Sequence, residues 1–519
     1  MENILRQVGQ LMFFGFDGYE VNDHAREAIC KYHMGNVILF TRNYRDAKQF
    51  YELIRDLQAL AMEYNGKPLL VAIDQEGGSV VRMMHDATWF PGPMAMRVAG
   101  EPDLAYRLGQ AVGREMAAYG LNVNLAPVVN MATNPNSPHA GARCFGADPE
   151  SCAPWAISYI RGVQESVYAT AKHYPGIGNS KVDLHLALGS NDRPLEELEK
   201  VELSPARVAV AAKVSTVMTS HEIYSAIDDQ PCTLSHKLLN DYLRGKYGFE
   251  GTVISDCMQM GALSRTIPTP IACVRAVQAG VDLLLVCHTR QVQIDSTMAL
   301  AEAVENGTIT QERLHDALAR IEKMKSGLKF PEKCPDTQAE FAKNRELAKY
   351  ACEKALTVIG SAEDLRCNED EKFLLLAPPP VALTLVDEQI GEAHLAKTVG
   401  ETYRNAKCIE YPIPMDDATL KELCKEMESF DKIIIGTYNA HTELQQQKLM
   451  EYANSLGKRV VGIALRTPMD ARYYGSATAV LTYEYTPPMV AAVMEAMAGR
   501  RKPTGKLPDD VRTILDATK

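Results

Sequence analysis

The segment 171–190, AKHYPGIGNSKVDLHLALGS, contains an aspartate and a histidine whose types and spacing suit proton transfer. Asp183 and His185 are two residues apart, so in an extended loop their side chains point to the same side. The carboxylate then holds one tautomer of the imidazole and stabilises the imidazolium, which makes the histidine a proton donor near neutral pH. The alternative is a surface aspartate and histidine with no special relation.

The same segment begins with Lys172 and His173, which end an apolar run and precede a Pro-Gly turn. A cation and a neutral donor in that position bind hydroxyl or carbonyl oxygens of a ligand. The alternative is a lysine that caps a strand and a core histidine whose partners are backbone groups.

A second candidate is Asp256 in VISDCMQMGAL, which follows an apolar run and precedes a helical segment. A carboxylate there attacks an electrophilic carbon or stabilises a positive centre. The alternative is a helix N-cap, a role for which Ser255 competes.

Carboxylates and arginines also gather in two glycine-containing stretches. AIDQEGGSVVR contains Asp74, which suits a pair of sugar hydroxyls, and Arg82, which we also expect to bind substrate. GARCFGADPE contains Arg143, whose fork of donors suits a carboxylate or a hydroxyl. The alternative for Arg143 is a structural ion pair with Asp148 or Glu150.

Eight short apolar runs, separated by helical stretches, must position these residues. This alternation predicts parallel strands that are buried on both faces. Eight strand–helix units are the number found in a closed (β/α)8 barrel of the TIM type. Polar residues follow six of the runs, at the face where such barrels place their sites: Asp74, Asn130, Lys172 with His173, His221, Asp256 and His288. His221 is therefore a further candidate for substrate binding. The runs are 9–15, 35–40, 68–74, 123–130, 169–173, 216–221, 251–256 and 281–288.

A smaller C-terminal α/β open-sheet domain is predicted after the polar, proline-punctuated stretch KFPEKCPDTQAEFAKN. Its apolar runs are 373–376, 433–436, 460–465 and 480–482, and a helix is expected over 339–355. We divide the chain into a barrel at 1–330, a linker with the start of a connecting helix at 331–350, and the second domain at 351–519.

Composition narrows the range of partners. A net charge of −11 and a pI near 5.7 disfavour nucleic acid and anionic membranes, which require a basic surface. The first 18 residues lack the pattern of a secretory signal, and the apolar runs are too short to span a bilayer. The charge is better suited to a small-molecule or neutral-polymer substrate. Twelve scattered cysteines with no C-x-x-C suit reduced thiols, so we expect a cytoplasmic protein.

Together these stretches resemble glycoside hydrolase family 3, in its β-N-acetylglucosaminidase branch. The resemblance covers roughly residues 5–330, and GKLP near the end is similar to the C-terminal domain of longer members. Its motifs here are DQEGG at 74–78 with Arg82, APV at 126–128 with NPN at 134–136, RCFGADP at 143–149, KHYPGIG at 172–178 with DLH at 183–185, and SD at 255–256.

The resemblance implies a retaining mechanism without metal or cofactor. Asp256 is then the nucleophile, and His185, paired with Asp183, is the acid and then the base. Asp74, Arg143, Lys172 and His173 are expected to bind the N-acetylglucosamine ring. Glycines 176 and 178 are expected to let the loop move His185 over the glycosidic oxygen, and the C-terminal domain is assigned no catalysis but a packing role or a homodimer contact.

Five positions depart from the family pattern: Ile177 replaces a histidine, Leu184 a serine or threonine, Gly189 a proline, Asn130 a common aspartate, and Cys257 follows the nucleophile. None removes a proposed catalytic group. The expected activity is release of N-acetylglucosamine from muropeptide-derived or chitin-derived saccharides, as in cell wall recycling.

Three alternatives remain at this stage. A phosphorylase is possible because a neutral imidazole repels an incoming phosphate less than a carboxylate does. A metal-dependent hydrolase would bind zinc through His173, His185, His221, Asp256 and His288. A non-catalytic sugar-binding barrel is the third.

Overall fold

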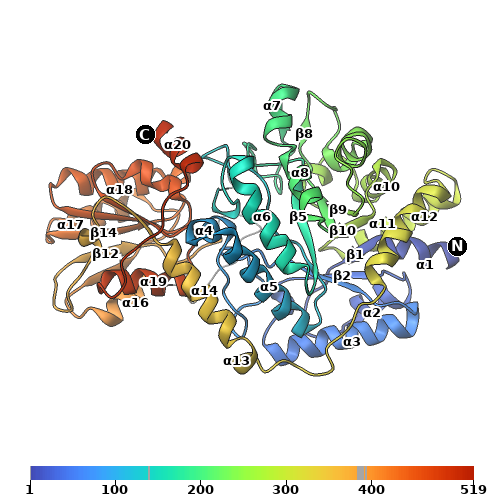
Figure 1. Cartoon of the computed structure of the whole chain (residues 1–519), viewed down its shortest axis with the longest axis horizontal. Coiled ribbons are helices and arrows are strands. Elements are labelled where there is room, and N and C mark those ends of the chain that lie inside the picture. The colour runs from blue at the N-terminus through green and yellow to red at the C-terminus, as the bar shows by residue number, and fades with distance from the viewer. Residues whose placement is uncertain (1, 138–140, 383–390, 392–393, 519) are drawn as a thin grey trace.

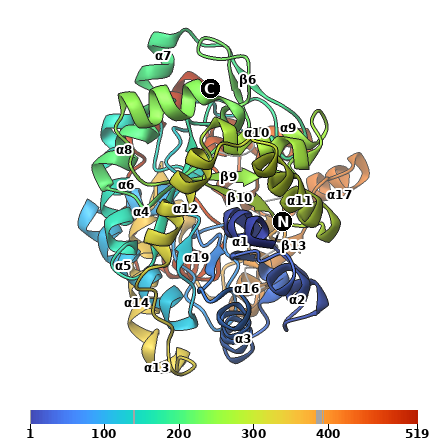
Figure 2. The ribbon, with the colours of Figure 1, turned by 90° about the vertical axis from the view of Figure 1, so that its right-hand side faces the viewer.

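The computed structural model describes residues 2–137, 141–382, 391 and 394–518. The chain forms a closed eight-stranded barrel followed by a separate six-stranded sheet with its own helices. In Figure 1 the barrel occupies the blue-to-yellow part of the molecule and the second domain the orange-to-red part. Figure 2 views the molecule from the barrel side, with the second domain behind.

The predicted barrel is confirmed, because each of the eight apolar runs overlaps one of its strands. All neighbouring pairs are parallel, and the barrel closes in the order β1-β10-β9-β7-β5-β4-β3-β2. Every residue of β3 and of β10 is buried, as expected for strands that are covered on both faces. The strands are β1 Met12–Phe14, β2 Asn36–Leu39, β3 Leu70–Ile73, β4 Val123–Asn124, β5 Tyr168–Tyr174, β7 Thr216–Thr219, β9 Thr252–Cys257 and β10 Leu283–Val286.

Helices follow the strands and bury apolar faces against them. The helix α3, Ala47–Asn65, shows how the sequence sets such an element: Asp46 accepts a hydrogen bond from the backbone N–H of Gln49 at its start, and Gly66 ends it in the left-handed region. The other helices of this part are α1 Glu2–Val8, α2 Asp23–Cys30, α4 Pro93–Ala99, α5 Pro102–Tyr119, α6 Pro149–Val163, α7 Leu195–Lys200, α8 Ser204–Ala212, the π-helix η5 Lys237–Lys246, α9 Gly261–Ser264, α10 Thr269–Ala279, α11 Arg290–Glu305 and α12 Gln311–Lys325.

The second domain is the predicted open sheet, in the order β11-β16-β15-β14-β12-β13. Its strands are parallel except β11, which pairs antiparallel with β16. The four predicted runs correspond to β12 Leu374–Ala377, β14 Lys432–Thr437, β15 Arg459–Ala464 and β16 Thr478–Leu481. The helices are α13 Thr337–Glu340, α14 Ala342–Ala355, α15 Ala362–Leu365, α16 Leu395–Thr402, α17 Asp417–Met427, α18 Leu444–Ser455, α19 Pro487–Met497 and α20 Asp509–Ala517.

The two edge strands, β11 Thr357–Ile359 and β13 Lys407–Glu410, were not predicted. Both are short and only partly buried, so neither forms the long apolar run that identified the central strands. A third small element, the two-stranded sheet of β6 Ser190–Asn191 and β8 Ile223–Tyr224, lies in the barrel loops and was not predicted either.

The second domain packs on the loops that follow β3 and β4. Arg97 of α4 forms a two-pronged ion pair with Asp510 of α20, with both N···O distances 2.9 Å. The backbone N–H of Gly92 donates to the carboxylate of Glu484, at 2.7 Å. These contacts attach the domain beside the carboxyl ends of the barrel strands. Within the described ranges, no helix combines the length and the apolar character needed to cross a membrane.

Candidate active site

A cavity of about 320 Å³ opens at the carboxyl ends of the barrel strands. Its wall combines polar side chains with apolar ones such as Phe40, Leu125 and Met218. Seven of the nine predicted site residues line it, namely Asp74, Arg82, Arg143, Lys172, His173, His185 and Asp256. The strand-end pattern in the sequence therefore identified a single place in the fold.

Asp74, directly after β3, is held between two cations. Its carboxylate accepts from Lys172 Nζ at 2.7 Å and contacts Arg82 Nη2 at 3.5 Å. Burial by itself raises the pKa of this carboxyl, but the attraction of Lys172 and Arg82 is larger and lowers the pKa to about 2. Asp74 is therefore an ionised acceptor of hydroxyl donors throughout the physiological pH range.

Glu76 continues this network and was not predicted as a site residue. Its carboxylate receives two parallel hydrogen bonds from Arg143, from Nε at 2.9 Å and from Nη2 at 2.8 Å, and lies 2.6 Å from Lys172 Nζ. Burial raises the pKa of the fully buried carboxyl, and the adjacent Arg143 and Lys172 lower it by more. Glu76 thus fixes the two cations that face the cavity, a positioning role.

The structure also decides the alternative for Arg143. Its partner is Glu76, 67 residues away in sequence, and not the nearby Asp148 or Glu150. Asp148 instead caps α6 by accepting from the backbone N–H of Ser151 at 2.8 Å. The signal available in the sequence was the alternation in DQEGG, which places Glu76 and Asp74 two residues apart at a strand end.

His173 faces the candidate nucleophile, with its Nε2 3.8 Å from Asp256 Oδ2. Asn130 fixes the imidazole from the other side. Its carbonyl oxygen accepts from the backbone N–H of His173 at 3.0 Å, so its amide nitrogen is the atom that lies 3.1 Å from His173 Nδ1 and donates to it. This arrangement places the ring proton on Nε2, toward Asp256.

Asp256 is the penultimate residue of β9, and its side chain is 24% exposed. The N-cap alternative is wrong, because the next helix, α9, begins at Gly261 with no side-chain cap. Ser255 accepts from the backbone N–H of Leu285 in the adjacent strand and caps no helix either. Asp256 Oδ1 accepts from the backbone N–H of Cys257 at 2.7 Å, which orients the carboxylate at the cavity wall.

Asp183 and His185 form the predicted pair. His185 Nδ1 lies 2.8 Å from Asp183 Oδ1, and the same oxygen accepts from the backbone N–H of His185 at 2.9 Å. The side chains are 15% and 22% exposed. A carboxylate partner requires a proton on Nδ1, so Nε2 is the nitrogen that exchanges a proton with a ligand in the cavity.

The loop that carries Asp183 and His185, residues 175–189, is attached to the segment after β9 by backbone hydrogen bonds and by apolar packing. The carbonyl of His185 accepts from the N–H of Gly261 at 2.9 Å, and that of Leu184 from the N–H of Ala262 at 3.1 Å. Ile177 and Leu184, two departures from the family pattern, pack with Met260 and Ala262 in one buried cluster. At these two positions, apolar contacts take part in holding the loop against the segment after β9.

The two loop glycines serve close packing in this conformation. A Cβ on Gly178 would lie 1.5 Å from the carbonyl oxygen of Met131, and one on Gly176 would lie 2.8 Å from that of Glu202. Both values are shorter than any ordinary contact, so only glycine allows the loop backbone to approach these segments. Close packing is enough to explain why glycine stands at both positions, and the expected mobility of the loop stays a prediction.

His221 takes a different place from the one expected. It is fully buried and is not part of the cavity wall. Its Nε2 donates to the carbonyl oxygen of Cys257 at 3.0 Å, and its Nδ1 lies 2.8 Å from Thr233 Oγ1. Burial lowers the pKa of the imidazole. His221 supports the backbone that follows Asp256 and does not face a substrate.

The zinc set of the metal-hydrolase alternative is not assembled. Among the described residues, the group whose ligand atoms meet is Cys257, Cys287 and His288, and only His288 belongs to that set. The cavity instead presents an aspartate and an aspartate-supported imidazole together with three cations and an ionised acceptor. A carboxylate that attacks carbon and an imidazole that transfers protons are the groups needed to break an acetal bond in two steps.

The comparisons with known proteins agree with this chemistry. The family description "Glycosyl hydrolase family 3 N terminal domain" matches residues 3–324. The solved structure of a glycoside hydrolase family 3 β-N-acetylglucosaminidase from Paenibacillus sp. str. FPU-7 superposes with a TM-score of 0.90 at 32% identity, covering 97% of this chain and 98% of that one.

Two curated relatives match different lengths of the chain. A β-hexosaminidase of Tolumonas auensis is 34% identical over 303 residues, which are 58% of this chain and 87% of the relative. β-Hexosaminidase A of Pseudoalteromonas piscicida is 25% identical over 543 aligned positions, covering 93% of this chain and 90% of the relative. Similarity therefore extends over both domains.

Proposed function

The chain belongs to glycosyl hydrolase family 3, and we propose that it is a retaining β-N-acetylglucosaminidase that releases N-acetylglucosamine from small β-linked saccharides. The observation that supports this most directly is the meeting of Asp256 and the Asp183-supported His185 at one cavity. The two curated relatives described above are named β-hexosaminidases, so the phosphorylase alternative is not favoured.

In the first step the Asp256 carboxylate attacks the anomeric carbon, and the bond from that carbon to the leaving oxygen breaks. His185 Nε2 gives its proton to the leaving oxygen, so the aglycone departs as a neutral alcohol. The Asp183 carboxylate, 2.8 Å from Nδ1, stabilises the imidazolium that exists before this transfer.

In the second step water attacks the same carbon and the bond to Asp256 breaks. His185, now neutral, accepts the proton of the water at Nε2, which restores the starting protonation state. Two displacements at one carbon retain the β configuration of the sugar.

The ion network gives the cavity its selectivity for hydroxyl groups. Asp74 offers an ionised acceptor, and Arg82, Lys172 and Arg143 offer donors that Asp74 and Glu76 hold in place. Because these charges largely balance one another, the site suits an uncharged sugar ring. His173, whose Nε2 proton points toward Asp256, orders the nucleophile and is a donor to the sugar.

Four further proposals accompany this activity. The saccharides derive from muropeptides or chitin, the former during cell wall recycling. The protein acts in the cytoplasm and forms a homodimer. Its C-terminal domain contributes no catalytic group, since the seven predicted site residues that line the cavity all belong to the barrel.

The test uses the full chain with a nitrophenyl N-acetyl-β-glucosaminide and the matching β-glucoside, each with and without phosphate. We expect hydrolysis of the acetamido sugar with a β product formed first, no dependence on phosphate, and covalent labelling of Asp256 by a fluorinated sugar donor. Asp256→Asn should abolish turnover, whereas Asp241→Asn, at an exposed position of η5, should not. A sugar phosphate as product, or label on another residue, would contradict the proposal.

A further inference from the structure

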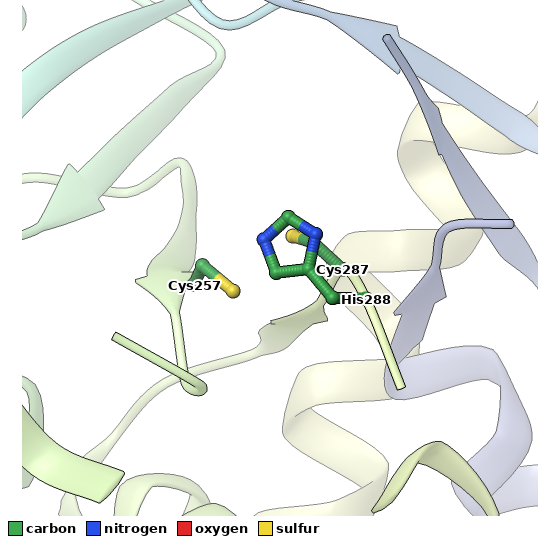
Figure 3. A group of neighbouring side chains, drawn as sticks. All are labelled: Cys257, Cys287 and His288. Atoms are coloured by element: carbon green, nitrogen blue, oxygen red, sulfur yellow. The ribbon is translucent and has the colours of Figure 1, made fainter. Parts of the chain in front are cut away.

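Three potential metal ligands that the proposed mechanism does not use converge beside the nucleophile. Cys257 ends β9, and Cys287 and His288 directly follow the neighbouring strand β10. Their ligand atoms all lie within 4.8 Å of one another. Figure 3 shows the Cys257 sulfur directed toward the imidazole of His288, with the Cys287 sulfur beside the ring. All three residues line the cavity that contains Asp256.

The set has the composition that thiophilic cations prefer. Zinc is bound by two cysteines and one histidine in sites that keep a fourth position open, and soft thiolate ligands select against magnesium and calcium. In a tetrahedral zinc site the ligand atoms are about 3.5–3.8 Å apart, as Zn–S bonds of about 2.3 Å require. The ligand atoms of the present group, within 4.8 Å of one another, move closer by side-chain rotation when a cation binds.

The backbone around the three ligands is already fixed. Arg42 Nη2 donates to the carbonyl oxygen of Cys287 at 3.0 Å, and Gln259 Oε1 accepts from the backbone N–H of His288 at 2.8 Å. The His288 ring packs against Phe40, with 5.7 Å between the ring centroids. Pre-ordered ligands lose little conformational entropy on binding a cation.

The charges and the thiol state near the ligands are compatible with a bound cation. The charge of Arg42, whose guanidinium contacts the Cys287 backbone, is offset by Asp17 at 2.7 Å. Neither thiol forms a disulfide, and the same is true of the other cysteines of the chain.

We propose that Cys257, Cys287 and His288 form a binding site for a thiophilic divalent cation such as Zn²⁺, and that its occupancy inhibits the enzyme. The two thiols release their protons to solvent and bind through sulfur, and His288 binds through a ring nitrogen. The fourth position faces the cavity, where water or the Asp256 carboxylate completes the coordination. A cation there neutralises the nucleophile and competes with the sugar.

The test uses the reduced full-length protein with Co²⁺ as a spectroscopic probe and Zn²⁺ as the competing ion. We expect one Co²⁺ per chain, a thiolate-to-cobalt charge-transfer absorption with the strong visible bands of tetrahedral cobalt, and loss of both on adding Zn²⁺. Zn²⁺ should inhibit hydrolysis competitively and a chelator should restore it, whereas Mg²⁺ should have no effect.

Ligand variants make the assignment specific. Cys257→Ser, Cys287→Ser and His288→Ala should each weaken binding at least about a hundredfold, since even groups outside the coordination sphere are worth about 10- to 100-fold. His288 is exposed, so its variant keeps the fold. Cys334→Ser, at a partly buried thiol outside the cavity, is the matched control and should bind the ion as the parent does.

Two results would overturn the proposal: no charge-transfer absorption with thiols known to be reduced, or undiminished Zn²⁺ inhibition in Cys287→Ser and His288→Ala. The second would place the ion on Asp256 and His185. The inhibition readout rests on the proposed function, but the spectrum does not. Absence of hydrolytic activity with a normal cobalt spectrum would therefore refute the activity and not the metal site.

Discussion

Replacing Asp183 with asparagine tests the proton-transfer pair with little change of shape. Asp183 Oδ1 accepts both from the His185 ring, at 2.8 Å, and from the His185 backbone, at 2.9 Å. An amide oxygen can keep both bonds, so the substitution removes mainly the charge that stabilises the imidazolium. A hydrogen bond to a charged group contributes about 1.5–3 kcal/mol, which corresponds to about 10- to 150-fold in rate.

This loss should appear only where protonation of the leaving group matters. For Asp183→Asn we expect kcat/KM on an N-acetylglucosamine disaccharide to fall by about 10- to 150-fold. On a dinitrophenyl glycoside, whose leaving group needs little protonation, the fall should be several times smaller. The ratio kcat/KM is the right quantity because it reports only the steps through formation of the glycosyl-enzyme.

The chain provides a matched control in its second domain. His394 Nδ1 and Glu410 Oε1 form a carboxylate–histidine pair at 2.7 Å, remote from the cavity. Glu410→Gln should leave kcat/KM on both substrates unchanged. Equal losses on the disaccharide and on the dinitrophenyl glycoside for Asp183→Asn would refute the role of Asp183, because a general disturbance of the loop affects both substrates alike.

Three other substitutions test the surroundings of the site. Glu76→Gln leaves Arg143 without its buried carboxylate partner and Lys172 with Asp74 alone, so the free energy of unfolding in denaturant should fall by about 3–5 kcal/mol; no loss would refute the network. Gly178→Ala should reduce turnover by more than tenfold, because its Cβ displaces the loop from Met131, whereas Gly400→Ala, with only ordinary contacts, should not. Burial raises the pKa of Glu484 from 4.5 to about 7, so the folded state binds a proton that the unfolded state has already lost. The free energy of unfolding should therefore fall by about 3 kcal/mol between pH 4.5 and 7, and Glu484→Gln should show a correspondingly smaller fall; identical pH profiles would contradict this.

The barrel and most of its site were predictable because both depend on local sequence features. Strands buried on both faces must be apolar throughout, and parallel strands in a closed barrel bring their carboxyl ends together whatever the loops between them do. Asp74, Lys172 and Asp256 therefore meet although they come from three distant parts of the chain. The pattern required no knowledge of the loops.

What the sequence left open depends on which partner a side chain selects across the fold. Arg143 had two acidic neighbours in sequence, yet its partner is Glu76, because Asp148 is already used as a helix cap. His221 follows a strand like the other site residues, but its ring nitrogens contact Thr233 and the Cys257 backbone beneath the cavity. The partner of such a side chain depends on packing in the folded protein, and no local pattern in the sequence indicates it.

In the loop that carries His185, two apolar side chains replace polar ones of the family pattern, so packing takes the place of hydrogen bonds. Ile177 is next to Gly178 and Leu184 is next to Asp183, and each stands where the family pattern has a polar side chain. Their burial with Met260 and Ala262 anchors the loop to the segment after β9. Each fully buried side chain of this size contributes about 1.5–3 kcal/mol, more than the hydrogen bond of about 1 kcal/mol that a serine hydroxyl would provide. The His185 loop is therefore held at least as firmly as a polar loop, which favours a fixed imidazole beside the sugar over one that moves in with each turnover.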